Sequence, residues 1–274
     1  MKTLVLHSLE TSAAKKLALE LRGEIEVRKS HFRIHTKKDF DIENFRLSNN
    51  FDLNIFDNNF DYQNIKLMVS DMDSTLITVE TIDEVAKEVD LKDEISLITE
   101  AAMQGHLDFT ESFKKRLSIL KGVSNSSFES VYNKKVEFSP GAKVLIEYFK
   151  SNQIRTAVVS GGLSFFAKKL QSQLGIDNCR ANNVEIINQS ITGNVIGNVI
   201  DAKEKAKYID ELCDQYKLKN NQVIAIGDGA NDIEMMKVAG LSVAYHAKPI
   251  LKQYCDIQIN YGSLASLIDF FVDA

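Results

Sequence analysis

The 274-residue chain lacks several features that define whole classes of protein. It holds only 2 prolines, no tryptophan and no low-complexity tract, while 44% of its residues are hydrophobic and 26% are charged. Collagen-like, disordered and coiled-coil proteins are thereby excluded. No hydrophobic run approaches the ~18–20 apolar residues that cross a bilayer, and residues 1–7 are too soon interrupted to form a signal peptide. We therefore expect a globular cytoplasmic protein with no membrane partner.

Cysteine and net positive charge are also scarce. The three cysteines, Cys179, Cys213 and Cys255, form no C-x-x-C pair and are odd in number, so neither a disulfide framework nor a thiolate zinc site is indicated. The 33 basic and 38 acidic side chains give a net charge of -5. This is the wrong sign for a protein that mainly binds phosphate backbones, so no nucleic-acid partner is expected.

Common catalytic motifs are missing as well. The 5 histidines are scattered, without the H-x-x-x-H or H-x-x-E-H spacing of a zinc hydrolase. No G-x-S-x-G sequence is present, and neither a Walker A nor a G-x-G-x-x-G phosphate loop is found. A nucleotide-driven kinase and a dinucleotide dehydrogenase are therefore disfavoured.

The chain changes in character near Asn64, where we expect a boundary between two domains, residues 1–64 and 65–274. The first part contains only one of the 13 glycines and predicts a small α+β unit. Its expected elements are strands at 3–7, 24–30, 31–36 and 51–56, with a helix at 12–21. In the second part, short apolar strands alternate with amphipathic helices, which predicts an α/β fold with a Rossmann-like parallel sheet and helices on both faces. The expected core strands are 67–70, 154–159, 223–226 and 241–244.

Two insertions interrupt this predicted sheet. The first two core strands are separated by about 80 mostly helical residues, far more than an ordinary connection, so we expect an inserted helical cap at about 77–138. Within the cap, Thr81 and Glu84 have the spacing of a capping box, and Gly122 is expected to close the last helix. Residues 184–200 are β-branched and contain two Gly-Asn pairs, which predicts a small β-hairpin.

Two of the expected core strands run directly into carboxylates. Asp71 and Asp73 follow the first strand, and their spacing places them on the same side of an extended chain. Asp228 and Asp232 follow the third strand, and ligands bind at the carboxyl edge of parallel sheets. Like charges so close need a cation, and hard oxygen ligands suit Mg²⁺. The alternatives are an ordinary turn at the first strand and a helix cap by Asn231 or Asp232 at the third.

Three further features could hold anionic groups. A small-residue turn is expected between a core strand and the next helix, at Ser160, Gly161 and Gly162. Free N–H groups at such a turn can bind phosphate. The alternative is an ordinary structural turn, because Gly-Gly pairs are common in turns. Lys205 lies on the apolar face of its helix, where it either snorkels to solvent or neutralises a phosphoryl group. Arg116 has a comparable position in the cap and suits a carboxylate.

Taken in order, these motifs resemble the four motifs of the haloacid dehalogenase-like phosphatases. Within that superfamily, the chain is similar to the phosphoserine phosphatases from about residue 65 to its end. The core segments that carry the resemblance are Asp71-Met72-Asp73-Ser74-Thr75-Leu76, Ser160-Gly161-Gly162, Lys205 and Gly227-Asp228-Gly229-Ala230-Asn231-Asp232. The closer match also uses residues 79–84, 113–122 and 244–249.

The resemblance implies a Mg²⁺-dependent hydrolysis of O-phospho-L-serine to L-serine and phosphate, the last step of serine biosynthesis. By carry-over, Asp71 attacks phosphorus to form an aspartyl-phosphate, and Asp73 donates and then accepts a proton. The implied metal ligands are Asp71, the Asp73 backbone carbonyl and Asp228. The implied phosphoryl ligands are Ser160, Gly161, Lys205 and Asn231, supported by Gly162 and Asp232. On the cap, Glu80 pairs with the substrate ammonium and Arg116 with its carboxylate.

Two other functions remain open at this point. The same chemistry could act on another small phosphorylated metabolite, because cap residues set specificity. Alternatively, Asp71 could accept phosphate slowly in a signalling module, although the large cap argues against this. Longer family members carry an ACT-like amino-acid-binding domain, and residues 1–64 are expected to be either a degenerate form of it or a structural extension. A monomer or a homodimer is expected.

Overall fold

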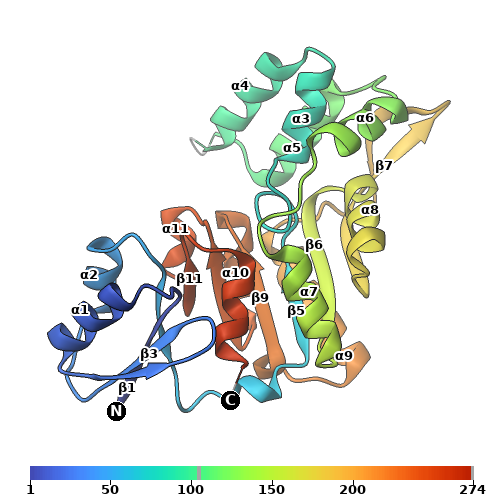
Figure 1. Ribbon diagram of the computed structural model, residues 1–274. Coiled ribbons are helices and arrows are strands. Elements are labelled where there is room, and N and C mark those ends of the chain that lie inside the picture. Colours follow the sequence, from blue (N-terminus) through green and yellow to red (C-terminus); the bar gives the residue numbers. More distant parts are fainter. Residues whose placement is uncertain (104–105, 273–274) are drawn as a thin grey trace.

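The computed structural model describes residues 1–103 and 106–272, and these form three parts. An N-terminal unit lies beside one edge of a larger core sheet, and a helical cap stands over the opposite end of the core (Figure 1). Of the helices in the described residues, none is long and apolar enough to cross a membrane.

The N-terminal unit is a four-stranded antiparallel sheet with helices on one face. Its elements are β1 (Lys2–Leu6), α1 (Thr11–Leu21), β2 (Glu24–Val27), β3 (Phe32–Thr36), α2 (Ile42–Leu47) and β4 (Leu53–Phe56). The strand order β2-β3-β1-β4 and the chain order βαββαβ are those of ferredoxin-like folds. The expected α+β unit is confirmed, but the sequence did not predict α2. This helix has only six residues, buries none of them and so shows no apolar stripe.

The core is a seven-stranded sheet in the described part of the chain, with the order β11-β10-β9-β5-β6-β7-β8. Its strands are β5 (Leu67–Ser70), β6 (Arg155–Leu163), β7 (Asn178–Ile187), β8 (Ser190–Ile196), β9 (Val223–Gly227), β10 (Leu241–Tyr245) and β11 (Ile257–Ile259). Every pairing is parallel except that of β7 with β8. The predicted Rossmann-like sheet is therefore confirmed.

Helices cover both faces of this sheet because its strands are apolar on both sides. The helices are α7 (Ala142–Ser151), α8 (Ser164–Leu174), α9 (Ala202–Tyr216), α10 (Ile233–Val238) and the short α11 (Pro249–Lys252). In β5, Met68 packs in one hydrophobic cluster with residues of α7 and α8. Its neighbours Leu67 and Val69 point the other way and pack with residues of α9 and α10.

The cap leaves and rejoins the core through a narrow paired neck. Its helices are α3 (Thr81–Glu88), α4 (Lys92–Met103), α5 (Phe109–Ile119) and α6 (Asn125–Lys135). An antiparallel bridge joins Ile77 to Phe138, and the N–H of Thr78 donates to the carbonyl of Glu137 at 3.0 Å. The helical insertion is confirmed, but the expectation that Gly122 closes its last helix is wrong. Gly122 lies between α5 and α6 with φ +89°, in the left-handed region that glycine tolerates.

The β-hairpin formed by β7 and β8 is also confirmed, although its turn is not at a Gly-Asn pair. Asn188 and Gln189 form the turn with φ values of 51° and 64°, as the tight turns of hairpins require. The hairpin reaches the cap, since Ile191 exchanges backbone hydrogen bonds with the α5–α6 connection: its N–H donates to Val123 O at 2.9 Å, and its carbonyl accepts from the Gly122 N–H at 2.8 Å. The cap is thus held both at its neck and by this hairpin (Figure 1).

Polar groups join the N-terminal unit to the core. The carboxylate of Asp52 accepts hydrogen bonds from the N–H groups of Asn260 at 2.6 Å and Gly262 at 2.7 Å. The amide of Asn54 donates to the carbonyl of Gln258 at 2.9 Å and accepts from its N–H at 2.8 Å. Because Asp52 and Asn54 are buried, these bonds satisfy groups that would otherwise lose water without compensation.

A buried ionic cluster centred on Asp269 makes a second connection. One carboxylate oxygen lies 2.8 Å from His7 Nδ1, and the other lies 3.2 Å from His31 Nδ1 and accepts the Ser30 hydroxyl at 2.5 Å. Arg33 donates to the backbone carbonyl of Asp269 at 3.0 Å. Burial alone would raise the pKa of Asp269, but hydrogen bonds from His31 and His7 hold it below its ordinary value. The cluster therefore favours the charged carboxylate.

We expect Asp269→Asn to lower the free energy of unfolding by about 3 kcal/mol, because the buried partners lose their charged acceptor. Urea unfolding followed by circular dichroism measures this loss. The matched control is Asp39→Asn, which changes an almost fully exposed carboxylate paired with Lys2 and should leave the midpoint unchanged.

This loss should depend on pH. A carboxylate with a depressed pKa contributes its stability above its unfolded pKa of ~3.9 and loses it as the pH falls through the lower folded value. The difference in the free energy of unfolding between the wild type and Asp269→Asn should therefore become smaller on acidification. Equal urea midpoints for the wild type and Asp269→Asn at neutral pH would show that the cluster does not stabilise the contact between the N-terminal unit and the core.

Candidate active site

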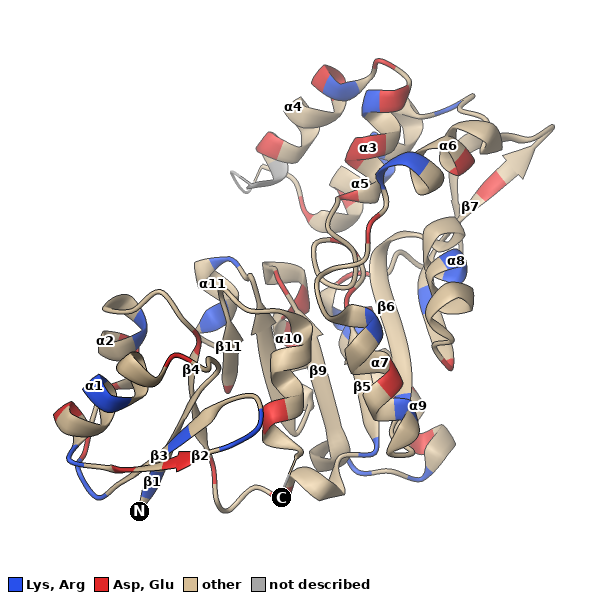
Figure 2. Ribbon diagram, viewed as in Figure 1, with Lys and Arg blue, Asp and Glu red and all other residues tan. Residues whose placement is uncertain are grey.

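The predicted carboxylates meet at one edge of the core sheet. Asp71 follows β5 and Asp228 follows β9, and these two parallel strands are neighbours. The Asp71 N–H donates to the carbonyl of Ile226 at 2.9 Å, which aligns the two strand ends. One carboxylate oxygen each of Asp71, Asp228 and Asp232 lies within 4.8 Å of the others. Figure 2 shows Asp and Glu segments on the loops between this edge and the cap.

Lys205 joins this carboxylate group from α9. Its Nζ lies 2.9 Å from Asp71 Oδ1 and 2.7 Å from Asp232 Oδ1, and the side chain is 0% exposed. Lys205 therefore does not snorkel to solvent. Burial alone would lower its pKa, but the carboxylates of Asp232 and Asp71 raise it above its ordinary value. The side chain consequently remains an ammonium within the site.

Asp232 is held by the backbone of its own loop. Its Oδ2 accepts the N–H groups of Asp228 and Gly229, both at 3.1 Å. A Cβ at Gly227 would lie 2.4 Å from the same oxygen, so the carboxylate can occupy this place only beside glycine. Helix α10 begins directly after Asp232, but the side chain makes no capping hydrogen bond to it. Asp232 thus occupies the N-cap position that the helix-cap alternative gave it, but its side chain bonds Lys205 and the loop backbone instead of capping the helix.

The acidic group carries more negative charge than its lysine neutralises. Burial, reinforced by Asp232, raises the pKa of Asp71 to about 8 and that of Asp228 to about 7, while Lys205 opposes both shifts. A cation among the carboxylates would relieve this repulsion. The donors are oxygens, which suit a hard divalent ion. Within the group formed with Asp232, the strand-end carboxylates of Asp71 and Asp228 thus have the donor chemistry to hold a metal ion.

The Asp73 side chain is bonded to the cap and is not one of the three grouped carboxylates. Its Oδ2 accepts a hydrogen bond from the Thr81 hydroxyl at 3.0 Å, whereas its buried Oδ1 has no hydrogen-bond partner among the described residues. Burial raises the pKa of Asp73 well above its ordinary value, and the nearby charges of Glu80 and Asp71 raise it further. The side chain can therefore carry a proton that an ordinary aspartate would lose.

Ser160, Gly161 and Gly162 lie beside Asp73, but they do not form the expected turn. All three belong to β6, and α8 begins only at Ser164. The pairing of β6 with β7 changes register across this stretch, as in a β-bulge. The Ser160 hydroxyl accepts the Gly162 N–H at 2.8 Å.

The cap closes directly over this stretch of strand. A Cβ at Gly161 would lie 2.6 Å from the ring of Phe109 in α5. On the other side, a Cβ at Gly162 would lie 3.0 Å from Asp73 Oδ2. The two glycines therefore allow the cap and the acid to approach the same strand.

Charged residues of the cap face the acidic site. The buried Nε of Arg116 has no hydrogen-bond partner among the described residues. Burial lowers the pKa of Arg116, and the negative charges of Asp83, Glu80 and Asp73 partly restore it. Glu80 is exposed, and its Oε1 accepts the Ser74 hydroxyl at 2.7 Å. A donor for an anion and an acceptor for a cation thus lie beside Asp73.

Some residues at the site were not predicted as site residues, and one has a role other than the predicted helix cap. Thr81 was expected to cap α3 with Glu84, but the N-cap is Glu80 and the Thr81 hydroxyl bonds Asp73 instead. Asp83 faces Arg116, and its signal in the sequence was its position three residues after Glu80. Lys248 donates its N–H to the carbonyl of Asp228 at 2.8 Å.

Asn231 lies in the 3₁₀ turn Ala230–Asp232, beside the strand-end carboxylates. A Cβ at Gly229 would lie 2.7 Å from the side-chain oxygen of Asn231, so this side chain folds back over the loop. The structure therefore brings every residue predicted for the site to this edge of the sheet or to the cap above it.

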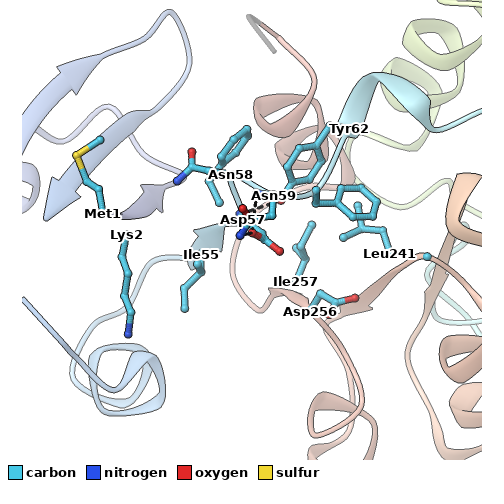
Figure 3. Close-up of a pocket in the computed structure, with 13 residues that line it drawn as sticks. Met1, Lys2, Ile55, Asp57, Asn58, Asn59, Tyr62, Leu241, Asp256 and Ile257 are labelled. Carbon is cyan, nitrogen blue, oxygen red and sulfur yellow. Dashed lines mark hydrogen bonds between the residues drawn. The ribbon is translucent and has the colours of Figure 1, made fainter. Parts of the chain in front are cut away.

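A separate hollow of about 650 Å³ lies between the N-terminal unit and the edge of the core sheet (Figure 3). Asp57, Asp256 and Lys2 are its charged lining residues. Asp256 accepts both the N–H and the hydroxyl of Ser242, and Lys2 pairs with Asp39 on the surface. Asp57 accepts the Asn59 N–H, so each of these three charged side chains already has a partner of its own.

Comparison with known proteins agrees with this geometry. The family model of haloacid dehalogenase-like hydrolases matches residues 68–237. A phosphoserine phosphatase from Polaromonas sp. is 43% identical over 209 residues, which cover 74% of this chain and 89% of the relative.

Two solved structures extend the similarity to the whole chain. A probable phosphoserine phosphatase from Vibrio cholerae is 29% identical with a TM-score of 0.85, covering 98% of this chain and 85% of that one. A HAD family hydrolase from Salmonella enterica serovar Typhi is 27% identical with a TM-score of 0.91, covering 99% and 98%. The resemblance seen in the ordered motifs is confirmed, and the chain belongs to the haloacid dehalogenase-like hydrolase family.

Proposed function

We propose that this hydrolase converts O-phospho-L-serine and water to L-serine and phosphate in a Mg²⁺-dependent reaction. One observation carries the choice of substrate: the buried Nε of Arg116 on the cap has no hydrogen-bond partner in the described part of the chain, and Glu80 supplies a carboxylate nearby. An arginine and a glutamate suit the carboxylate and the ammonium of an amino acid. The phosphoserine phosphatases among its relatives support the same substrate.

In the first step, Asp71 attacks the phosphorus atom. Lys205 and the Met72 N–H both contact its Oδ1, at 2.9 and 2.7 Å, which leaves Oδ2 for the attack. A new Oδ2–P bond forms as the bond from phosphorus to the serine oxygen breaks. Asp73 gives its proton to that departing oxygen, so serine leaves as the neutral hydroxyl.

In the second step, water attacks phosphorus in the aspartyl-phosphate. Asp73 now accepts the proton of the water, the Asp71–phosphate bond breaks and inorganic phosphate leaves. The same carboxyl group thus acts as acid and then as base, and both residues return to their starting states.

Charge neutralisation is the remaining requirement of phosphoryl transfer. The groups assigned to the phosphoryl oxygens are Lys205, the Ser160 hydroxyl, the Gly161 N–H and Asn231, with Gly162 and Asp232 as supports. The residues assigned to Mg²⁺ are Asp71, Asp228 and the backbone carbonyl of Asp73. When bound, the ion supplies positive charge to the phosphoryl oxygens. Asp232 is left to orient Lys205, because its two oxygens are already taken by the ammonium and by two backbone N–H groups.

We further propose that residues 1–64 and 65–274 are two domains, with the cap at about 77–138. The ferredoxin-like order of the first supports a degenerate ACT-like domain. A cytoplasmic monomer or homodimer that performs the last step of serine biosynthesis is the setting that follows from this activity.

Asp71→Asn should abolish turnover of phosphoserine, with kcat at least about a thousandfold lower, because the amide is not a nucleophile. Release of inorganic phosphate from L-phosphoserine, compared with a panel of other phosphomonoesters, measures the effect. The control Asp90→Asn alters an exposed cap aspartate with φ 58°, a conformation that asparagine adopts readily, and should be fully active.

The same panel separates the three functions. Wild-type turnover that is no faster on phosphoserine than on other esters would assign the chemistry to a different metabolite. A stable phosphorylated chain without turnover would favour the signalling module instead.

Arg116→Met should lower kcat/KM for phosphoserine about 10- to 100-fold, the loss typical of one hydrogen-bonded ionic contact. Methionine keeps an apolar stem in the partly buried position. O-phosphoethanolamine lacks the carboxylate, so the variant and the wild type should hydrolyse it at similar rates. Equal losses on both substrates would contradict a carboxylate contact by Arg116.

Mg²⁺ should raise the thermal unfolding midpoint by about 5 °C near saturation, and Asp228→Asn should remove most of that shift. The binding should also weaken on acidification. Because the pKa of Asp228 is about 7 and that of Asp71 about 8, protons compete with the ion below these values.

Calorimetric titration with Mg²⁺ at pH 8.5 and pH 6 measures this dependence, with the higher affinity expected at pH 8.5. Equal affinity at both values would contradict binding by these carboxylates.

A further inference from the structure

Two side-chain hydrogen bonds tie the loop after the nucleophile to the start of the cap. The Thr81 hydroxyl donates to Asp73 Oδ2 at 3.0 Å, and the Ser74 hydroxyl donates to Glu80 Oε1 at 2.7 Å. Two consecutive residues of the loop are thus bonded to two consecutive residues of the cap. Ser74 adopts this arrangement at a φ of 54°, which non-glycine residues seldom occupy.

Thr81 uses its hydroxyl in an unusual way for its position. It is the first residue of α3 and is fully buried. Hydroxyl groups near the start of a helix commonly bond the helix backbone. Here the N-cap is Glu80, which makes no side-chain capping bond, and the Thr81 hydroxyl is bonded to Asp73.

This bond makes the two oxygens of Asp73 unequal. Oδ2 accepts the Thr81 hydroxyl, whereas Oδ1 is buried and has no hydrogen-bond partner among the described residues. When the carboxyl group is protonated, an oxygen that already accepts a donated hydrogen bond is the poorer place for the proton. A proton on this carboxyl group is therefore expected on Oδ1.

Gly162 limits the movement of the same carboxyl group from the opposite side. A Cβ at this position would lie 3.0 Å from Asp73 Oδ2 and 3.1 Å from the Ser160 hydroxyl oxygen. Asp73 is thus bounded by the strand β6 and by the cap residue Thr81. Its orientation depends on where the cap places α3.

We propose that Thr81 is a positioning residue that directs the proton of Asp73 through Oδ1 to the departing oxygen of the substrate. The inference rests on the proposed function, in which Asp73 is the acid. Because Thr81 adjoins Glu80, the cap segment that binds the substrate ammonium also sets the direction of proton transfer. Binding of the correct substrate and orientation of the acid are thereby coupled through one dipeptide.

The test compares leaving groups that differ in their need for an acid. Serine leaves as a strongly basic alkoxide unless it is protonated, whereas p-nitrophenolate leaves readily without a proton. We expect Thr81→Val, which keeps the β-branched shape, to lower kcat/KM for phosphoserine about 10- to 100-fold, a part of the ~10²–10⁴-fold that acid catalysis contributes. For p-nitrophenyl phosphate, the loss should stay below about threefold, because kcat/KM reports only the steps up to leaving-group departure.

Thr81→Ser keeps the hydroxyl and should restore the wild-type ratio between the two substrates. The matched control is Thr99→Val in α4, where the lost hydroxyl donates only to the carbonyl of Ile95 in its own helix. Thr99→Val should leave kcat/KM unchanged for both phosphoserine and p-nitrophenyl phosphate. If Thr81→Val does not fold, as judged by circular dichroism, Thr81→Ala removes the same hydroxyl with less bulk and is evaluated by the same ratio.

Equal losses on both substrates would overturn the proposal, since a damaged cap would slow them alike. Unchanged kinetics in folded Thr81→Val would overturn it as well. If the wild type does not hydrolyse phosphoserine, the proposed function fails by itself, and the comparison is made between p-nitrophenyl phosphate and an alkyl phosphate that the enzyme accepts.

Discussion

The ammonium of Lys205, buried between Asp71 and Asp232, is the interaction on which the site depends. A lone charge with no exposure would be too costly to keep, and so would two carboxylates facing each other without a cation. Together they fix three elements of the fold, because β5, α9 and the loop after β9 each contribute one partner. The backbone N–H groups that hold the other oxygen of Asp232 extend this arrangement to Asp228. The site is therefore organised by compensation of charge within the protein itself.

Much of the site could be predicted from the sequence because its main residues follow a simple rule. Asp71 and Asp228 end apolar strands, and neighbouring parallel strands bring their ends to one edge. Lys205 was detectable as a charge on an apolar helix face. The outcome for Lys205 depended on tertiary structure, since only the fold shows that two carboxylates replace the solvent around its ammonium.

Local signals were less reliable where distant contacts decide the conformation. The Gly161-Gly162 pair indicated a turn, but in the fold it lets a strand pass close to Phe109 and Asp73. Thr81 had the spacing of a capping residue, and its hydroxyl found a partner outside its helix. The hairpin turn at Asn188 lacks the expected glycine. For Gly161, Gly162 and Thr81, the preference of the short segment was outweighed by contacts with residues distant in the sequence.

The contact between Asn54 and Gln258 has a consequence for the behaviour of the protein in solution. β11 is an edge strand, and edge strands with free backbone groups can pair with other chains. The Asn54 amide offers one donor and one acceptor, and it meets the carbonyl and the N–H of Gln258 much as a neighbouring strand would. The N-terminal unit thus closes this side of the sheet against strand addition. Residues far from the chemistry thereby take up backbone groups of this edge that another chain could otherwise bind.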